Sequence, residues 1–293
     1  FLITIALAAL TYALIEAPQY AALGLSVIAF IAFAILERRT DHPIVPLTLF
    51  RSRAFTAANA LTLLLYAALS IAVFFLPFDF IQLQKYSPAQ AGAAFLPLVV
   101  TMSLFSRWTG ALADRIGPRL PLIGGPLTAA IGLGLLAVPG IGGSYWTTFF
   151  PGLLVLGVGM AITVAPLTTT VMTSIDDERH AGAASGINNA ISRAAGLLAI
   201  ALFGAISIVA FARDLDRRLG RETPAIRSSI LAQKTKLVEA EPPRNLDGAT
   251  RARVRGAIEA SFLRAFRIDM LAAAALAFAA AATALPIQVS SRR

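Results

Sequence analysis

The chain has 293 residues, of which 57% are hydrophobic and only 14% are charged. Its mean hydropathy of +0.73 lies far from the balance of a soluble domain and indicates a membrane protein. The net charge is +9, but most of the bases lie between apolar runs, where they indicate membrane topology rather than nucleic-acid binding. The sequence has no Cys, and its two His lie in polar connections, so we expect no metal site and no cofactor.

Apolar runs divide the chain into eight candidate transmembrane segments. A helix needs roughly 20 apolar residues to cross about 30 Å of hydrocarbon, and the first two runs are shorter than the others. Ala and Leu dominate the runs, whereas a barrel would show short alternating strands. The expected fold class is therefore an all-α integral membrane protein with eight transmembrane helices, at residues 1–17, 21–36, 54–78, 89–113, 120–139, 145–175, 181–211 and 262–287.

Arginine residues on alternate connections predict the orientation of these helices. The short connections on one side carry only Lys85, so the opposite, Arg-rich side is expected to be cytoplasmic. This places residues 212–261 outside, although that connection is rich in bases, because long connections follow the rule poorly. It contains two helix-like stretches, which we expect to lie on the outer surface. The cytoplasmic Arg are Arg38, Arg39, Arg51, Arg53, Arg115, Arg119, Arg179, Arg292 and Arg293.

Polar residues are shared unevenly among the runs. The fifth and eighth runs are almost free of them and are predicted to be peripheral, while the third, fourth, sixth and seventh are predicted to line a cavity or an interface. The Thr cluster of the sixth run favours backbone bonding rather than solute contact. The third run carries one helical stripe, and the seventh is expected to place its polar residues on one face. The candidate cavity or interface residues are Asn59, Thr62, Tyr66, Ser70, Asn188, Asn189 and Arg193.

Charged residues within the runs are few. Arg193 lies about a dozen residues into its helix, where a charge is costly and should face a partner or water. We leave open whether it contacts a solute or forms a structural ion pair. Glu16, Asp79 and Asp269 fall near the outer ends of their helices, where we expect easy solvation and no special role.

Four stretches resemble one protein family: "GALADRIGPR", "ERRTDHPIVPLTLFRSRAF", "VAPLTTTVM" and "ASGINNAISRAAGLLAIALFG". The first is similar to the loop signature of the major facilitator superfamily. All four together resemble its fourteen-helix drug:proton antiporters over nearly the whole chain. The resemblance implies an interdomain transmembrane hairpin at 1–40, followed by a C-terminal six-helix transport bundle at 41–293. That bundle would be an inverted repeat of three plus three helices.

The resemblance also implies that part of the protein is missing here. The chain starts with Phe1 inside an apolar run, so we expect further sequence upstream, namely the N-terminal six-helix half. The signature would then act as a latch that holds the two halves together on the cytoplasmic side. Gly117 is expected to make the turn, because glycine tolerates unusual backbone angles. The expected latch residues are Gly110, Asp114, Arg115, Gly117 and Arg119.

The expected function is secondary active transport in a bacterial inner membrane, with export of an amphipathic, drug-like solute in exchange for protons. The partners are the solute, the proton, the bilayer and the missing half, with no nucleic acid. An enzyme is disfavoured, because the runs contain no acid–base pair or nucleophile in a catalytic arrangement. Two alternatives stay open: export of a metabolite, siderophore or lipid precursor, and a membrane assembly subunit that does not transport.

Overall fold

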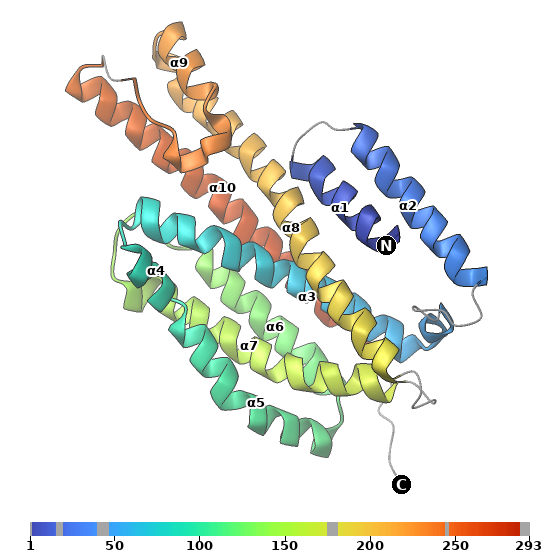
Figure 1. The fold of residues 1–293 in the computed structure, drawn as a ribbon. Helices are drawn as coiled ribbons and strands as arrows, with labels where there is room; N and C mark the ends of the chain where they lie inside the picture. The colour runs from blue at the N-terminus through green and yellow to red at the C-terminus, as the bar shows by residue number, and fades with distance from the viewer. Residues whose placement is uncertain (1, 16–19, 40–46, 175–180, 244–245, 288–293) are drawn as a thin grey trace.

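The computed structural model describes residues 2–15, 20–39, 47–174, 181–243 and 246–287. The described residues form helices and their connections, with no strand among them (Figure 1). The elements in chain order are α1 (Leu2–Ile15), α2 (Tyr20–Arg39), η1 (Leu47–Arg51), α3 (Arg53–Phe78), the π-helical η2 (Asp79–Leu83), α4 (Pro88–Ala93), α5 (Leu96–Ile116), α6 (Arg119–Leu136), α7 (Tyr145–Thr173), α8 (Ala181–Arg218), η4 (Leu219–Arg221), α9 (Pro224–Leu231), η5 (Lys234–Glu239) and α10 (Gly248–Thr283).

Each of the eight predicted runs is helical in the structure, although the fourth is divided between α4 and α5, and α8 and α10 extend beyond their predicted runs. Within the described residues, six helical segments are long and apolar enough to cross a membrane, and they contain α3, α5, α6, α7, α8 and α10. The remaining two are shorter: α1 has 14 residues, and the apolar part of α2 covers only Gly24–Phe33. These two helices pack against each other beside α8 (Figure 1), and the Ser26 hydroxyl donates to the Ala6 carbonyl at 2.8 Å.

The helices of the bundle pack in two equivalent groups. α3 packs against α8 and α10, and α7 packs against α5 and α6, while α6 and α10 contact each other. Exchange of α3 with α7, α5 with α8, and α6 with α10 maps the first group onto the second. This packing follows the three-plus-three repeat that the sequence led us to expect.

Glycines line the seam between α6 and α7. A Cβ on Gly132 would lie 2.5 Å from the backbone nitrogen of Leu156, and one on Gly159 would lie 2.4 Å from that of Ala129. Neither position leaves room for a side chain, so the two backbones approach as closely as small residues permit in membrane helices. The bulky side chains of the core pack on either side of this seam, among them Leu122, Leu133, Leu153 and Leu156.

Of the two helix-like stretches in the predicted outer connection, the first forms the separate short helices α9 and η5, whereas the second is part of α10 rather than a separate surface helix. α8 continues to Arg218 and α10 already starts at Gly248, so both helices project beyond the bundle (Figure 1). Their 38 and 36 residues correspond to about 57 and 54 Å, far more than the hydrocarbon thickness. Asp247 caps α10, because its side chain accepts from the Thr250 backbone N–H at 2.9 Å, and this bond lowers the pKa of Asp247.

We call residues 212–261 the outer extension, because they lengthen α8 and α10 beyond the rest of the bundle (Figure 1). It has its own apolar core between α8, α9, η5 and α10, made by Leu215, Leu219, Ile230, Val238, Val254 and Ile258. The exposed face of α8 changes from apolar at Val209 to basic at Arg213, and that of α10 changes from basic at Arg267 to apolar at Ile268. These two changes mark the level at which the helices leave the membrane.

Candidate functional site

A polar cluster joins α3 to α8. The side-chain amide of Asn188 donates to the Thr62 hydroxyl at 2.6 Å and to the Asn59 side-chain oxygen at 3.2 Å. Asn59 and Thr62 are themselves buried, and each donates back to a carbonyl of α3, those of Phe55 and Ala58, at 2.9 Å. The cluster therefore ties two helices together inside this chain, as polar residues do between membrane helices.

The other two residues of the α3 stripe have different surroundings. Tyr66 is half-buried and packs against the apolar core. Ser70 faces α8 at a point of close approach, where a Cβ on Gly196 would lie 2.7 Å from the Ser70 hydroxyl. Of the four stripe residues, Asn59, Thr62 and Ser70 thus face α8.

The polar residues of α8 do not share one face, contrary to the sequence-based prediction. Asn188 points to α3, whereas the next residue, Asn189, is exposed and only donates to the Ser185 carbonyl of its own helix. Arg193 is exposed one turn further on and makes no hydrogen bond or ion pair with the described residues. The split has a simple cause: successive helical residues are about 100° apart, so two adjacent Asn fall on either side of a narrow contact stripe.

The exposed face of Asn189 and Arg193 is the strongest candidate for a functional surface. Arg193 lies 12 residues into α8, about 18 Å from the helix start, and further along the same helix Leu197 and Leu202 are about half exposed. An amide and a guanidinium at this depth gain nothing from lipid contact. This face therefore requires water or a polar partner that the described residues do not provide.

The Thr cluster of α7 behaves as predicted. The hydroxyls of Thr163, Thr168 and Thr170 each donate to the carbonyl four residues earlier, at 2.8–3.0 Å. Thr169 and Thr173 do the same at 3.2 and 2.9 Å. Such bonds satisfy the hydroxyl within its own helix and leave no donor for a solute.

The predicted latch lies at the turn between α5 and α6. α5 ends at Ile116, and Gly117 adopts a φ of +81°, which confirms its expected role in the turn. Arg115 is exposed, Arg119 is half-buried at the first position of α6, and Gly110 faces α7 at ordinary contact distance, with the Ala165 Cβ 3.8 Å from a Cβ built on it. Asp114 belongs to α5, but its side chain lies outside the described residues.

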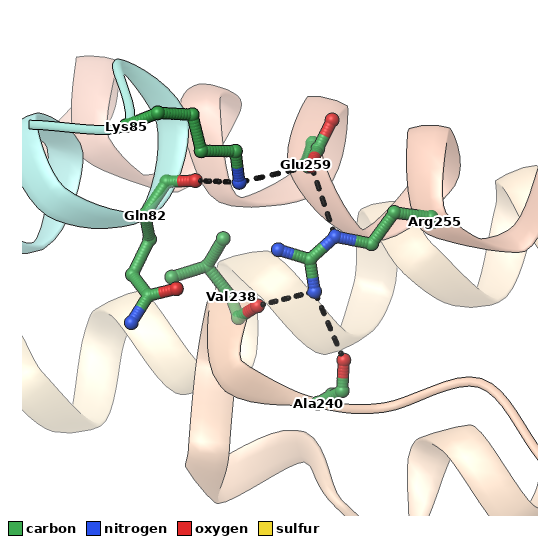
Figure 2. Close-up of polar contacts among 6 residues, drawn as sticks. All are labelled: Gln82, Lys85, Val238, Ala240, Arg255 and Glu259. Carbon is green, nitrogen blue, oxygen red and sulfur yellow. Dashed lines mark hydrogen bonds and ion pairs between the residues drawn. The ribbon is translucent and has the colours of Figure 1, made fainter. Parts of the chain in front are cut away.

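At the opposite end of the bundle, the turn between α3 and α4 is tied to its neighbours. The Gln84 side chain donates to the Asp79 carboxylate and to the Gly140 carbonyl, both at 3.0 Å. Lys85 lies 3.7 Å from Glu259 of α10, and Glu259 accepts from Arg255 at 2.9 Å (Figure 2). Arg255 also donates to the Val238 carbonyl at 3.2 Å within residues 212–261, so the contact of Lys85 with Glu259 is the one that connects the bundle to this part of the chain (Figure 2).

An aromatic hollow opens beside this turn, between α4, α5 and the start of α7. Its volume is about 480 Å³, and Tyr86, Tyr145, Trp146 and Phe150 form much of its wall. The Tyr145 hydroxyl donates to the Ala94 carbonyl at 2.7 Å, and burial together with the charge of Asp79 raises the pKa of Tyr86. Tyr and Trp gather where membrane helices meet water, so the hollow fits the level of the lipid headgroups.

Two buried acids were misjudged from the sequence. Asp79 is 1% exposed and Asp269 is 0% exposed, so neither is easily solvated as we had expected, and Glu16 lies outside the described residues. The spacing of apolar residues could have revealed Asp269, since it lies in the buried stripe of α10 with Phe262, Phe266 and Ala273. Among the described residues, no group of three His, Cys, Asp or Glu could hold a metal ion.

The fold and its polar helices match a known family. The sequence profile described as the Major Facilitator Superfamily matches residues 1–200, and the chain belongs to this superfamily. With its six spanning helices and its bacterial relatives, it is a multi-pass protein of the bacterial inner membrane.

Curated relatives of the chain are named as resistance and export proteins. It is 30% identical over 242 residues to the multidrug resistance protein Stp of Mycobacterium tuberculosis, which covers 79% of this chain and 44% of the relative. It is 35% identical over 175 residues to a lincomycin resistance protein of Streptomyces lincolnensis, covering 60% and 36%. It is 28% identical over 290 residues to the tetracenomycin C resistance and export protein of Streptomyces glaucescens, covering 94% and 53%. The chain thus spans about half the length of these relatives or less.

Proposed function

We propose that this chain is the C-terminal part of a secondary active transporter that exports amphipathic, drug-like solutes in exchange for protons by alternating access. The observation that carries the proposal is the exposed face of Asn189 and Arg193 in a chain of this superfamily. Such a face suits a water-filled cavity or a moving interface, and it does not suit lipid. The names of the relatives favour antibiotics as the class of solute.

The domain organisation is part of the same proposal. Residues 1–40 form an interdomain hairpin and residues 41–293 form the transport bundle, with 212–261 as its extracytoplasmic part. A second six-helix half covers the exposed face of α8, in line with relatives that are about twice as long. The turn residues Gly110, Asp114, Arg115, Gly117 and Arg119 form a latch between the two halves on the cytoplasmic side.

Transport by the full-length protein tests this function. Reconstituted into liposomes with an acidic interior, the protein is expected to accumulate ethidium, puromycin or lincomycin, and collapse of the pH gradient should release the solute. Accumulation that is insensitive to the pH gradient would contradict proton coupling. Absence of flux for all three probes, in protein that is correctly inserted, would favour a different solute or a subunit that does not transport.

A further inference from the structure

Asp269 is an unusual carboxyl group in this bundle. It lies in α10 and faces α8, where its Oδ2 atom is 2.6 Å from the Ser207 hydroxyl oxygen. Its side chain is fully buried, and its Oδ1 atom has no hydrogen-bond partner among the described residues. It lies two residues past Arg267, just inside the level at which α10 enters the membrane.

The surroundings of Asp269 do not suit a negative charge. An ionised carboxylate has about four lone-pair sites to satisfy, and here one hydroxyl serves one of them. The nearest arginines of α10 are used elsewhere: Arg264 pairs with Asp214 at 3.3 Å, and Arg267 donates to the Val138 and Pro139 carbonyls at 3.2 Å. A buried charge without a cation is unfavourable, whereas a neutral carboxyl group can donate its proton to Ser207 at the same distance.

No other neighbouring element supplies a countercharge within the described residues. In α3, the charged residues are Arg53 at its first position and Asp79 just after its end, and Asp79 is a second acid. In α6, the charged residue is Arg119 at the first position, at the opposite end of the bundle. In α8, the charged residue closest in sequence to Ser207 is Arg213, which is exposed. The next residue, Asp214, pairs with Arg218 and Arg264.

We propose that Asp269 is a proton-binding site, which holds a proton while α8 and α10 are packed together and exchanges it with the outer side when they part. The step is a simple proton transfer: a hydronium ion gives one proton to the Asp269 carboxylate and becomes water as an O–H bond forms, and on release that bond breaks and the proton passes to a water molecule. This inference rests on the proposed proton-driven transport. It adds the site at which the proton binds.

The seam between the two helices offers a route to this site. Asp214 lies seven residues after Ser207 on α8, two turns or about 10 Å further out, and its arginine partners are about half exposed. The buried Ser261 hydroxyl, which has no partner among the described atoms, lies on α10 two turns outward from Asp269. Polar groups therefore continue from the water-exposed base of the outer extension to the buried carboxyl.

Asp79 is less suited to the same role, although it is also buried. Its partner Gln84 belongs to the adjoining turn of the chain, so relative motion of the helices does not separate them. The contact between Ser207 and Asp269 joins two long helices, and any shift of α8 against α10 breaks it. Proton binding at Asp269 can thus favour the packed arrangement of the two helices over the separated one.

Infrared spectroscopy of the full-length protein in lipid vesicles tests protonation without reference to transport. At neutral pH, the wild-type protein is expected to show a protonated-carboxyl C=O band that is absent in Asp269→Asn and displaced in frequency in Ser207→Ala. Thr163→Ala, which removes a buried hydroxyl that bonds only within its own helix α7, is the control and should leave the band in place. A difference spectrum between wild type and Asp269→Asn without this band would overturn the proposal.

Transport of ethidium tests the coupling role in the same vesicles. Asp269→Asn is expected to abolish accumulation driven by a pH gradient but to retain exchange of labelled for unlabelled ethidium, and Asp269→Glu should recover part of the driven accumulation. Driven accumulation by Asp269→Asn at the wild-type level would overturn the coupling role, as would loss of exchange together with driven transport. Failure of the wild-type protein itself to transport would count against the proposed function, while the infrared result would still decide the protonation of Asp269.

Discussion

Asn188 and Thr62 lie 2.6 Å apart, amide nitrogen to hydroxyl oxygen, and this contact joins α8 to α3. Because Asn188 is turned inward, Asn189 and Arg193 are turned away from the bundle and remain exposed. One hydrogen-bonded contact inside the chain thus defines which polar residues stay available for a partner. Asn188, which packs inside the bundle, and Asn189, which is exposed, are therefore adjacent in the sequence.

Asn188→Ala should destabilise the bundle, whereas Asn189→Ala should not. The first change removes two hydrogen bonds between helices and leaves the buried Asn59 oxygen without its donor, at an expected cost of about 1–2 kcal/mol. The second removes an exposed amide that bonds only its own helix. Reversible unfolding in mixed micelles, followed by circular dichroism, measures both. Equal stability of the two variants would show that the cluster contributes little.

Gly132→Ala should weaken the seam between α6 and α7, and Gly134→Ala serves as its control in the same helix. A Cβ at position 132 would lie 2.5 Å from the Leu156 backbone nitrogen, while one at position 134 meets nothing within 4 Å. Overpacking of this kind typically costs about 1–3 kcal/mol. The thermal midpoint of the purified protein should fall for the first variant and stay or rise for the second. A lower thermal midpoint for Gly134→Ala than for Gly132→Ala would exclude the close backbone contact between α6 and α7.

The orientation of the chain can be tested directly, since the sequence has no Cys and labelling has no background. Lys234→Cys lies at an exposed position of the outer extension, and Arg115→Cys lies at an exposed position beside the latch turn. A maleimide that does not cross membranes should label position 234 in intact cells and position 115 only in inverted vesicles. Labelling of position 234 from the cytoplasmic side alone would invert the predicted topology.

The latch proposal predicts a functional defect for Asp114→Asn. In the full-length protein this change should lower transport several-fold while insertion and expression are kept, because the residue is proposed to bias a conformational equilibrium rather than to fill a core. Asp247→Asn, at the exposed cap of α10, is a control acid far from the turn. Transport by Asp114→Asn at the wild-type level would contradict the latch role and leave the signature only its role in the turn between α5 and α6.

Much of the fold could be predicted from the sequence, since apolar length and turn residues act locally. The six spanning helices, the turn at Gly117 and the backbone bonding of the α7 threonines all follow from such local signals. Local signals do not show which helix packs against a given helix face. Periodicity shows that Asn188 and Asn189 are polar neighbours, but only the packed position of α3 shows that one is inside and the other outside.

The length of α8 and α10 and the burial of Asp269 escaped prediction for a related reason. The seventh predicted run ends at residue 211, but α8 continues to Arg218 because its apolar face packs against α9, η5 and α10. A charge pattern shows where lipid ends and does not show where a helix ends. Asp269 was likewise judged by its nearness to a membrane surface, whereas its side chain is fully buried and bonds to Ser207 of α8.

The final prediction concerns Arg193 and a second half of the protein. The chain alone should insert into membranes but should not transport, and co-expression with an N-terminal six-helix half should restore transport. Arg193→Ala should abolish or strongly reduce this recovery, since its guanidinium has no partner among the described residues and lies too deep for lipid to be its natural contact.

Arg213→Ala is the matched control for this experiment. It removes an exposed Arg from the same helix at the level where α8 leaves the membrane, where the side chain can reach water without a protein partner. Transport by the Arg213→Ala pair should therefore equal that of the wild-type pair. Full recovery of transport with Arg193→Ala, or solute flux through the chain alone, would contradict the proposed contact between the exposed face of α8 and an N-terminal half.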